Sequence, residues 1–185
     1  MKKTAILLFW FYSFLLAGNQ SGYPVYHLQK TERVQLDGRL HEAFWQKADS
    51  IAGLTMVEPH EGDLPSQPTS VRIAMDEQNI YLGVRCARKD GLPIVYISRI
   101  RDSRLRDEDY IKFIFDTNLD RRTGYIFAIN PVGTRYDALV ANFGEKENRD
   151  WDGNWEARTV IEDWGWSAEI HIPIQTLTFA DGLRE

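Results

Sequence analysis

Apolar and polar residues alternate along most of this chain, which is the pattern of a half-buried β-strand. Between residues 80 and 86, for example, Ile80, Leu82 and Val84 take every second position and share one face. The same period of two recurs in residues 71–75, 111–115, 125–129, 155–161 and 166–172. Six such runs predict an all-β fold, an antiparallel β-sandwich.

The connecting segments agree with this fold. They are short and carry Asp, Asn, Gly or Pro, which favour tight turns between antiparallel strands. A helical pattern is confined to residues 40–48, where Leu40, Phe44 and Ala48 share a face, and one further turn is expected after Pro173. We therefore expect one short N-terminal helix beside the sandwich, and a surface loop at residues 58–68, which contain three prolines.

The N-terminus predicts a secretory signal peptide at residues 1–18. Lys2 and Lys3 precede an apolar run at residues 5–17, which is shorter than the roughly 20 residues needed to span a bilayer. The mature domain is then expected at residues 19–185. We expect it to be exported to the periplasm or the cell surface of a bacterium, in association with the outer membrane.

Charge and cysteine content narrow the possible partners. Loss of the two lysines with the signal peptide would change the net charge from −5 to −7, which disfavours binding to nucleic acid and to anionic membrane surfaces. The single cysteine, Cys86, cannot form an internal disulfide, and its place in an apolar strand predicts a buried, unreactive thiol. Export without disulfides is typical of a bacterial periplasm.

Three stretches, in this order, resemble the family 9 carbohydrate-binding module. Residues 36–45, LDGRLHEAFW, are similar to the family's opening D-G-x-L-D-E-x-x-W. Residues 69–84 resemble its next pair of strands, and residues 165–173, GWSAEIHIP, resemble a late strand. Together these stretches extend over nearly all of the mature chain.

The resemblance implies a jelly-roll-like β-sandwich that binds oligo- or polysaccharides, often with structural calcium. It implies a non-catalytic domain that serves polysaccharide breakdown or uptake, because the family occurs attached to glycoside hydrolases. In relatives with this N-terminal placement, a β-rich region like an outer-membrane barrel follows as a partner. The chain stops at Glu185, where the family would add another strand, so the resemblance implies a fragment or a shortened member.

Sugar binding needs aromatic planes for the C–H face of the ring and planar polar groups for the hydroxyls. Trp151 is the first candidate because it lies in a loop, outside the strand alternation; the alternative is a loop anchor packed on the end of the sandwich. Trp45, Trp155 and Trp166 share the apolar faces of their elements and are expected in the core. The predicted carbohydrate site comprises Trp151, Trp164, Asn148, Asp152 and Asn154.

Two acidic turns are candidate calcium sites, since calcium needs several hard oxygen ligands. The first is not an EF-hand, because Arg121 replaces the glycine and Phe127 the closing glutamate of that motif. The alternative is that these side chains cap their own turns. The candidate ligands are Asp116, Asn118 and Asp120 in one turn, and Asp107 and Asp109 in the other.

Two other functions stay open at this point. Related sandwiches hold haem, and Met56, Met75 and His171 are the candidate axial ligands here. The chain could instead be a structural or docking domain for the C-terminal barrel region. No arrangement of catalytic residues is evident, and Glu169 is expected on a polar strand face, paired with an arginine across the sheet.

Overall fold

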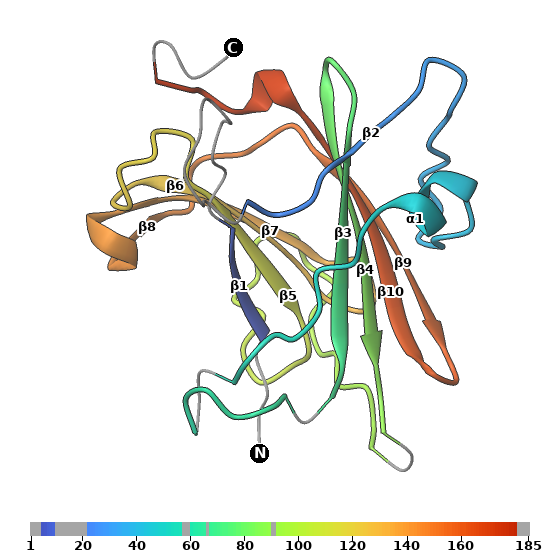
Figure 1. Ribbon diagram of the computed structural model, residues 1–185. Coiled ribbons are helices and arrows are strands. Elements are labelled where there is room, and N and C mark those ends of the chain that lie inside the picture. Colours follow the sequence, from blue (N-terminus) through green and yellow to red (C-terminus); the bar gives the residue numbers. More distant parts are fainter. Residues whose placement is uncertain (1–4, 10–21, 57–59, 66, 90–91, 181–185) are drawn as a thin grey trace.

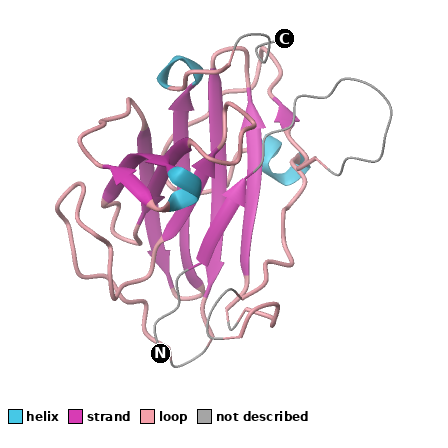
Figure 2. Cartoon of the chain, turned by 90° about the vertical axis from the view of Figure 1, so that its left-hand side faces the viewer, coloured by secondary structure: helices cyan, strands magenta, loops and turns pink. Residues whose placement is uncertain are grey.

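The computed structural model describes residues 5–9, 22–56, 60–65, 67–89 and 92–180. Within these ranges the chain forms two five-stranded β-sheets (Figure 1), and one short α-helix, α1 (Ala43–Lys47), precedes the third strand. Strands dominate and the helical pieces are short (Figure 2). The predicted all-β sandwich with one short N-terminal helix is confirmed. None of the helices in these ranges is long and apolar enough to cross a membrane.

The first sheet has the strand order β1-β5-β6-β7-β8. The strands are β1 (Ala5–Phe9), β5 (Ile111–Phe115), β6 (Gly124–Ile129), β7 (Arg135–Ala141) and β8 (Lys146–Asn148). β1 runs parallel to β5, whereas the other neighbours are antiparallel. The residues of β1 belong to the predicted signal peptide, which stays a prediction. Cleavage would leave β5 at the edge of this sheet.

The second sheet has the strand order β2-β3-β4-β10-β9. The strands are β2 (Tyr26–His27), β3 (Thr69–Met75), β4 (Asn79–Ala87), β9 (Glu156–Glu162) and β10 (Gly165–Pro173). β2 runs parallel to β3, and the other pairs are antiparallel. The turn expected after Pro173 is confirmed as the 3₁₀ helix η2 (Ile174–Thr176), and a second one, η1 (Asn142–Gly144), joins β7 to β8.

The core between the sheets consists of side chains from every second strand position. Leu82 of β4 and Phe113 and Phe127 of the first sheet are fully buried there. Trp155 and Trp166 belong to the same cluster, as predicted, and Trp155 packs edge-on against Phe127 with 5.3 Å between ring centroids. Such edge-to-face pairs add to the stabilisation that burial provides.

Helix α1 covers the outer face of the second sheet. Phe44 and Trp45 are buried there against Ala74 of β3. Gly83 of β4 leaves room for the indole, since a Cβ at that position would lie 3.1 Å from the Trp45 ring. Trp45 is therefore buried as predicted, but beneath the helix and not between the sheets.

Cys86 lies on β4, as the alternation predicted. Burial raises the pKa of its thiol to about 12. The thiol is therefore protonated at neutral pH, and a protonated thiol is a poor nucleophile. The residue is half-buried, and its lack of reactivity stays a prediction.

The register places Arg158 of β9 across from Glu169, as expected, but the Glu169 carboxylate binds other groups. Glu169 is only 1% exposed, and its carboxylate accepts hydrogen bonds from the Trp45 indole and from the backbone N–H groups of Asp37 and Gly38, each at 2.9 Å. Strand alternation places Glu169 on the outer face of β10, but α1 and the segment before it cover that face. Gly38 has a φ of +88°, and a Cβ there would lie 2.9 Å from the backbone of Thr159. The Asp-Gly pair and Glu169 thus join this segment to the sheet.

Glu169 should make stability depend on pH. Burial raises its pKa from 4.5 to about 7, although the three donors oppose the shift. Between these values the folded state binds more protons than the unfolded chain, so the free energy of unfolding should fall as the pH rises, by at most about 3 kcal/mol. Denaturant unfolding of the wild type and Glu169→Gln at a series of pH values from about 4 to 8 should show a shallower slope in the variant. The exposed Glu156→Gln is the control, and equal slopes in wild type and Glu169→Gln would refute the assignment.

Candidate functional site

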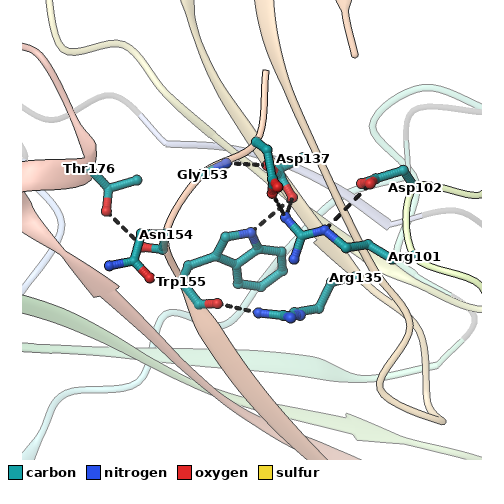
Figure 3. A network of polar contacts seen from close by, with 9 residues as sticks. Arg101, Asp102, Arg135, Asp137, Gly153, Asn154, Trp155 and Thr176 are labelled. Carbon is teal, nitrogen blue, oxygen red and sulfur yellow. Dashed lines mark hydrogen bonds and ion pairs between the residues drawn. The ribbon is translucent and has the colours of Figure 1, made fainter. Parts of the chain in front are cut away.

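A buried carboxylate organises one end of the sandwich. Asp137 of β7 is fully buried and lies opposite Phe127 of β6, on the face that points between the sheets. Its Oδ2 accepts the backbone N–H of Gly153 at 2.6 Å. Its Oδ1 accepts the Trp155 indole N–H at 3.0 Å and the Arg101 guanidinium at 2.7 Å (Figure 3). We call these residues, together with Asp152, the Asp137 network.

The network offsets a large desolvation cost. A charge between two sheets is tolerated only when it is paired and hydrogen-bonded. Burial raises the pKa of Asp137, whereas the donors of Gly153, Trp155 and Arg101 lower it. The donors come from two segments far apart in the sequence, one with Arg101 and one with Gly153 and Trp155, so satisfying this one carboxylate joins two loops to β7.

Arg101 extends from the buried carboxylate to the surface. Its guanidinium also pairs with Asp152, whose side chain is 76% exposed. Its Nε lies 3.4 Å from Asp102 (Figure 3). Two residues after Asp152, Asn154 is exposed, and its backbone carbonyl accepts a hydrogen bond from Thr176 at 2.7 Å. Arg101 thus connects the buried carboxylate to Asp152, and the loop that contains Asp152 also exposes Asn154.

Trp151 folds back against the core from the same loop. Its ring meets Tyr125 and Phe127 edge-on, with centroid distances of 5.1 Å and 5.9 Å. The lack of a side chain at Gly153 permits this position of the Trp151 ring, because a Cβ on residue 153 would lie 2.7 Å from it. This packing is that of the loop anchor considered from the sequence. The indole is nevertheless half-buried, and its contact with a sugar stays a prediction.

The structure does not bring all five predicted sugar-binding residues together. Trp151, Asp152 and Asn154 share one loop, and Asn148 lies nearby on β8, where its Oδ1 accepts the N–H of Asp150. Trp164 occupies the turn at the far end of β9, roughly 20 Å away or more by the rise of seven strand residues. There Arg85 stacks on its ring at 3.6 Å and its indole donates to Glu162. Trp164 therefore belongs to another surface.

The first acidic turn has the geometry of self-capping. The Asp116 carboxylate accepts the backbone N–H groups of Asn118, Asp120 and Arg121. The Asp120 carboxylate accepts those of Arg122 and Thr123 as well as the Thr123 hydroxyl. Oxygens engaged in this way do not offer the open ligand set that calcium requires.

The second acidic turn also binds backbone groups. Asp109 accepts the N–H of Val95 at 2.9 Å, and the neighbouring Glu108 accepts that of Ile97 at 2.8 Å. Asp107, next to Glu108, has a positive φ of 69°. Across the described residues, no three His, Cys, Asp or Glu side chains are grouped as metal ligands. The residues present do not fit a calcium ion at either turn.

The candidate haem ligands are dispersed. The His171 Nε2 lies 2.8 Å from Asn79 Oδ1, and its ring stacks on Tyr81 at 5.1 Å. Met75 ends β3, and Met56 lies in the loop before that strand, where its backbone pairs with Asp63. The structure shows no convergence of His171 with either methionine, and haem ligation stays a prediction.

Sequence reasoning missed Arg101 and the role of Asp137. Asp137 stands at a core-facing strand position, where a charged residue is unusual and requires partners. That signal is readable from the alternation of residues 135–141. The alternation does not identify the partner of Asp137, since Arg101 lies 36 positions away in an irregular segment.

Solved structures resemble this fold. A family 9 carbohydrate-binding module from Caldicellulosiruptor kristjanssonii, in complex with cellotriose, matches with a TM-score of 0.55 at 12% identity, over 80% of this chain and 67% of that chain. A structure described as the same kind of module in complex with glucose matches with a TM-score of 0.56 at 12% identity, over 80% and 68%. A candidate carbohydrate-binding protein from Bacteroides uniformis reaches 0.61 at 13% identity, over 82% and 72%.

These matches confirm that the fold is like that of family 9 modules, as the sequence resemblance implied. Their identities are low, so the likeness concerns the fold alone. No protein-family model matches the chain, and no curated protein does.

The Asp137 network predicts an unequal effect of two similar substitutions. Asp137→Asn should lower the free energy of unfolding by about 3 kcal/mol. The substitution removes the buried negative charge that pairs with Arg101. It also places an amide NH₂ group, which cannot accept a hydrogen bond, against at least one of the three donors. Asp152→Asn, which removes the exposed partner of the same arginine, should cost less than about 1 kcal/mol. Denaturant unfolding measures both. Equal costs would show that the buried carboxylate does not hold this end of the sandwich.

Proposed function

We propose that this domain binds a neutral oligosaccharide at the loop end of the sandwich, on the surface formed by Trp151, Asp152, Asn154 and Arg101. The observation that carries the proposal is the loop at residues 151–155, which Asp137 holds at Gly153 and Trp155 and which presents a half-buried indole at Trp151 and exposed polar side chains at Asp152 and Asn154. Carboxylate, amide and guanidinium groups bind sugar hydroxyls, and an aromatic ring receives the C–H face. The fold supports this proposal, since similarly folded modules are solved with cellotriose and with glucose.

Charge favours a neutral ligand. Arg101 is flanked by three aspartates, Asp102, Asp137 and Asp152, which neutralise its guanidinium. An anionic sugar would find no net positive charge at this surface, and the chain as a whole is acidic, with a net charge of −5. Glucose-based oligosaccharides are therefore the first class to test.

We propose a binding role without catalysis. Glycosidases place two carboxyl groups on either side of the scissile bond, within reach of the substrate. Asp137 is fully buried and already accepts hydrogen bonds from three donors, so its carboxylate faces no substrate. Asp152 is paired with Arg101. Asp137 thus has a structural role, and Asp152 a role in ligand binding.

The place of this activity in the cell is part of the proposal. The apolar N-terminal run supports export, and a non-catalytic sugar-binding domain outside the cytoplasm would hold polysaccharide near enzymes or transporters that break it down or take it up. Binding by the isolated chain would then be weak, since avidity comes from the larger assembly.

Calorimetric titration with glucose, cellotriose and a panel of other neutral oligosaccharides tests the proposal. Trp151→Ala should lower the affinity at least about tenfold, the effect of losing one aromatic contact of about 1.4 kcal/mol. Trp164→Ala is the matched control and should bind as the wild type does, because its ring lies at the far end of β9.

Trp151 also packs on the core, so a second variant separates binding from folding. Asn154→Ala changes an exposed side chain and should lower the affinity about fivefold through one lost hydrogen bond, with an unchanged midpoint of thermal unfolding. A folded wild type that binds none of the sugars, or a loss of binding in Trp164→Ala alone, would contradict the proposed site.

A further inference from the structure

A second surface lies on the connection from β4 to β5. Residues 92–106, which we call the strap, contain no helix or strand and pass along the end of the first sheet. The strap is firmly attached. The backbone N–H of Ile97 donates to the buried Glu108 at 2.8 Å, and the carbonyl of Ser98 accepts hydrogen bonds from Asn130 and Thr134. Leu105 is buried in an apolar cluster on the outer face of the first sheet.

The strap exposes an unusual number of apolar side chains. Ile97 is 66% exposed and Ile100 is 77% exposed, although both lie between the attached points of the strap. Of the nine large hydrophobic side chains that are exposed in the described ranges, five are in the strap: Leu92, Val95, Tyr96, Ile97 and Ile100. Because the backbone of this segment is held by hydrogen bonds, these side chains are presented to solvent by the fold. Apolar groups gathered on a surface mark an interaction site.

The strap is also basic. It contains four arginines and one aspartate, in a chain whose net charge is −5. Arg101 is paired with Asp102, Asp137 and Asp152, so the positive charge that the strap offers to a partner comes from its other three arginines. Arg99, Arg104 and Arg106 are exposed. The guanidinium of Arg99 lies 5.9 Å from the ring centre of Tyr96, so charged and apolar groups are interleaved on one surface.

Exposed apolar side chains together with exposed arginines determine which kind of partner can bind the strap. A symmetric dimer through the strap would bring the arginines of one copy against those of the other, and like charges facing each other are costly. The partner must instead offer negative charge together with an apolar interior. An anionic lipid bilayer offers both: phosphates bind the arginines, while aliphatic and aromatic side chains enter the boundary between headgroups and acyl chains. A bilayer also requires no complementary groove.

We propose that the strap binds the surface of a bilayer containing anionic phospholipid, with Ile97 and Ile100 inserted and Arg99, Arg104 and Arg106 on the phosphates. The same exposed apolar side chains and the same arginines would draw the domain onto a membrane surface. Arg101 of the strap belongs to the proposed sugar site, whereas Ile97, Ile100, Arg99, Arg104 and Arg106 do not, so membrane binding and sugar binding can fail separately.

Co-sedimentation with vesicles tests the proposal. The wild type should partition onto vesicles of phosphatidylcholine with phosphatidylglycerol more than onto phosphatidylcholine alone, and added salt should weaken binding. Ile97→Ser with Ile100→Ser should lower the partition coefficient at least about tenfold. Arg99→Gln and Arg104→Gln should lower it about fivefold each on the anionic vesicles.

Two controls match these variants. Phe143→Ser changes a side chain that is 71% exposed in η1, and Arg158→Gln changes an exposed arginine on β9. Both should partition within about twofold of the wild type, since neither residue lies on the strap. All variants share one N-terminus, so any lipid binding by the apolar residues 5–17 is common to them. Thermal unfolding verifies that each variant is folded.

Three results would overturn the proposal. The wild type could bind anionic vesicles no better than neutral ones, or the strap variants could partition as the controls do. Light scattering could instead show that the chain self-associates and that the isoleucine variants abolish association while vesicle binding is unchanged. That last result would assign the strap to a protein interface.

Discussion

The buried carboxylate of Asp137 is the constraint on which the loop end of this sandwich depends. A charge between two sheets has to find donors, and those donors come from Arg101, Gly153 and Trp155, on segments that strand pairing alone would leave unattached. Breaking a buried pair of this kind costs several kcal/mol. The resulting order extends to the surface, where Asp152 shares the same arginine. Rigid polar groups bind a ligand with less loss of entropy than mobile ones, which connects the buried charge to the proposed function.

A second buried carboxylate does similar work on the opposite sheet. Glu169 accepts the Trp45 indole and two backbone N–H groups, and so holds the segment before α1 against β10. In both places an acidic side chain on a strand joins an irregular segment to the sheet through an indole and backbone donors. The stretches of sequence that resemble family 9 modules contain Glu169, Trp45 and their partners Asp37 and Gly38, so that part of the resemblance has a structural explanation in this chain.

The strands and the burial of Trp155, Trp166 and Trp45 could be predicted because alternation reports directly on which face is apolar. Glu169 shows the limit of that reasoning, since alternation cannot tell a solvent-facing strand from one covered by a helix. The separation of Trp151 from Trp164 was within reach of the sequence: the two residues flank a predicted strand and must lie at its opposite ends. The pairing of Arg101 with Asp137 could not be predicted from the sequence, because it depends on the path of an irregular segment that no periodic pattern describes.

The most direct test of the central claim follows the indole N–H signals of the ¹⁵N-labelled chain by NMR during titration with cellotriose. Trp155 donates to Asp137, Trp151 lies in the loop that Asp137 holds, and Trp164 lies at the far end of β9. The account predicts saturable shifts of the Trp151 and Trp155 signals and of the Gly153 amide, with the Trp164 signal unchanged. Shifts confined to Trp164, or no shift at any indole in a folded sample, would contradict it.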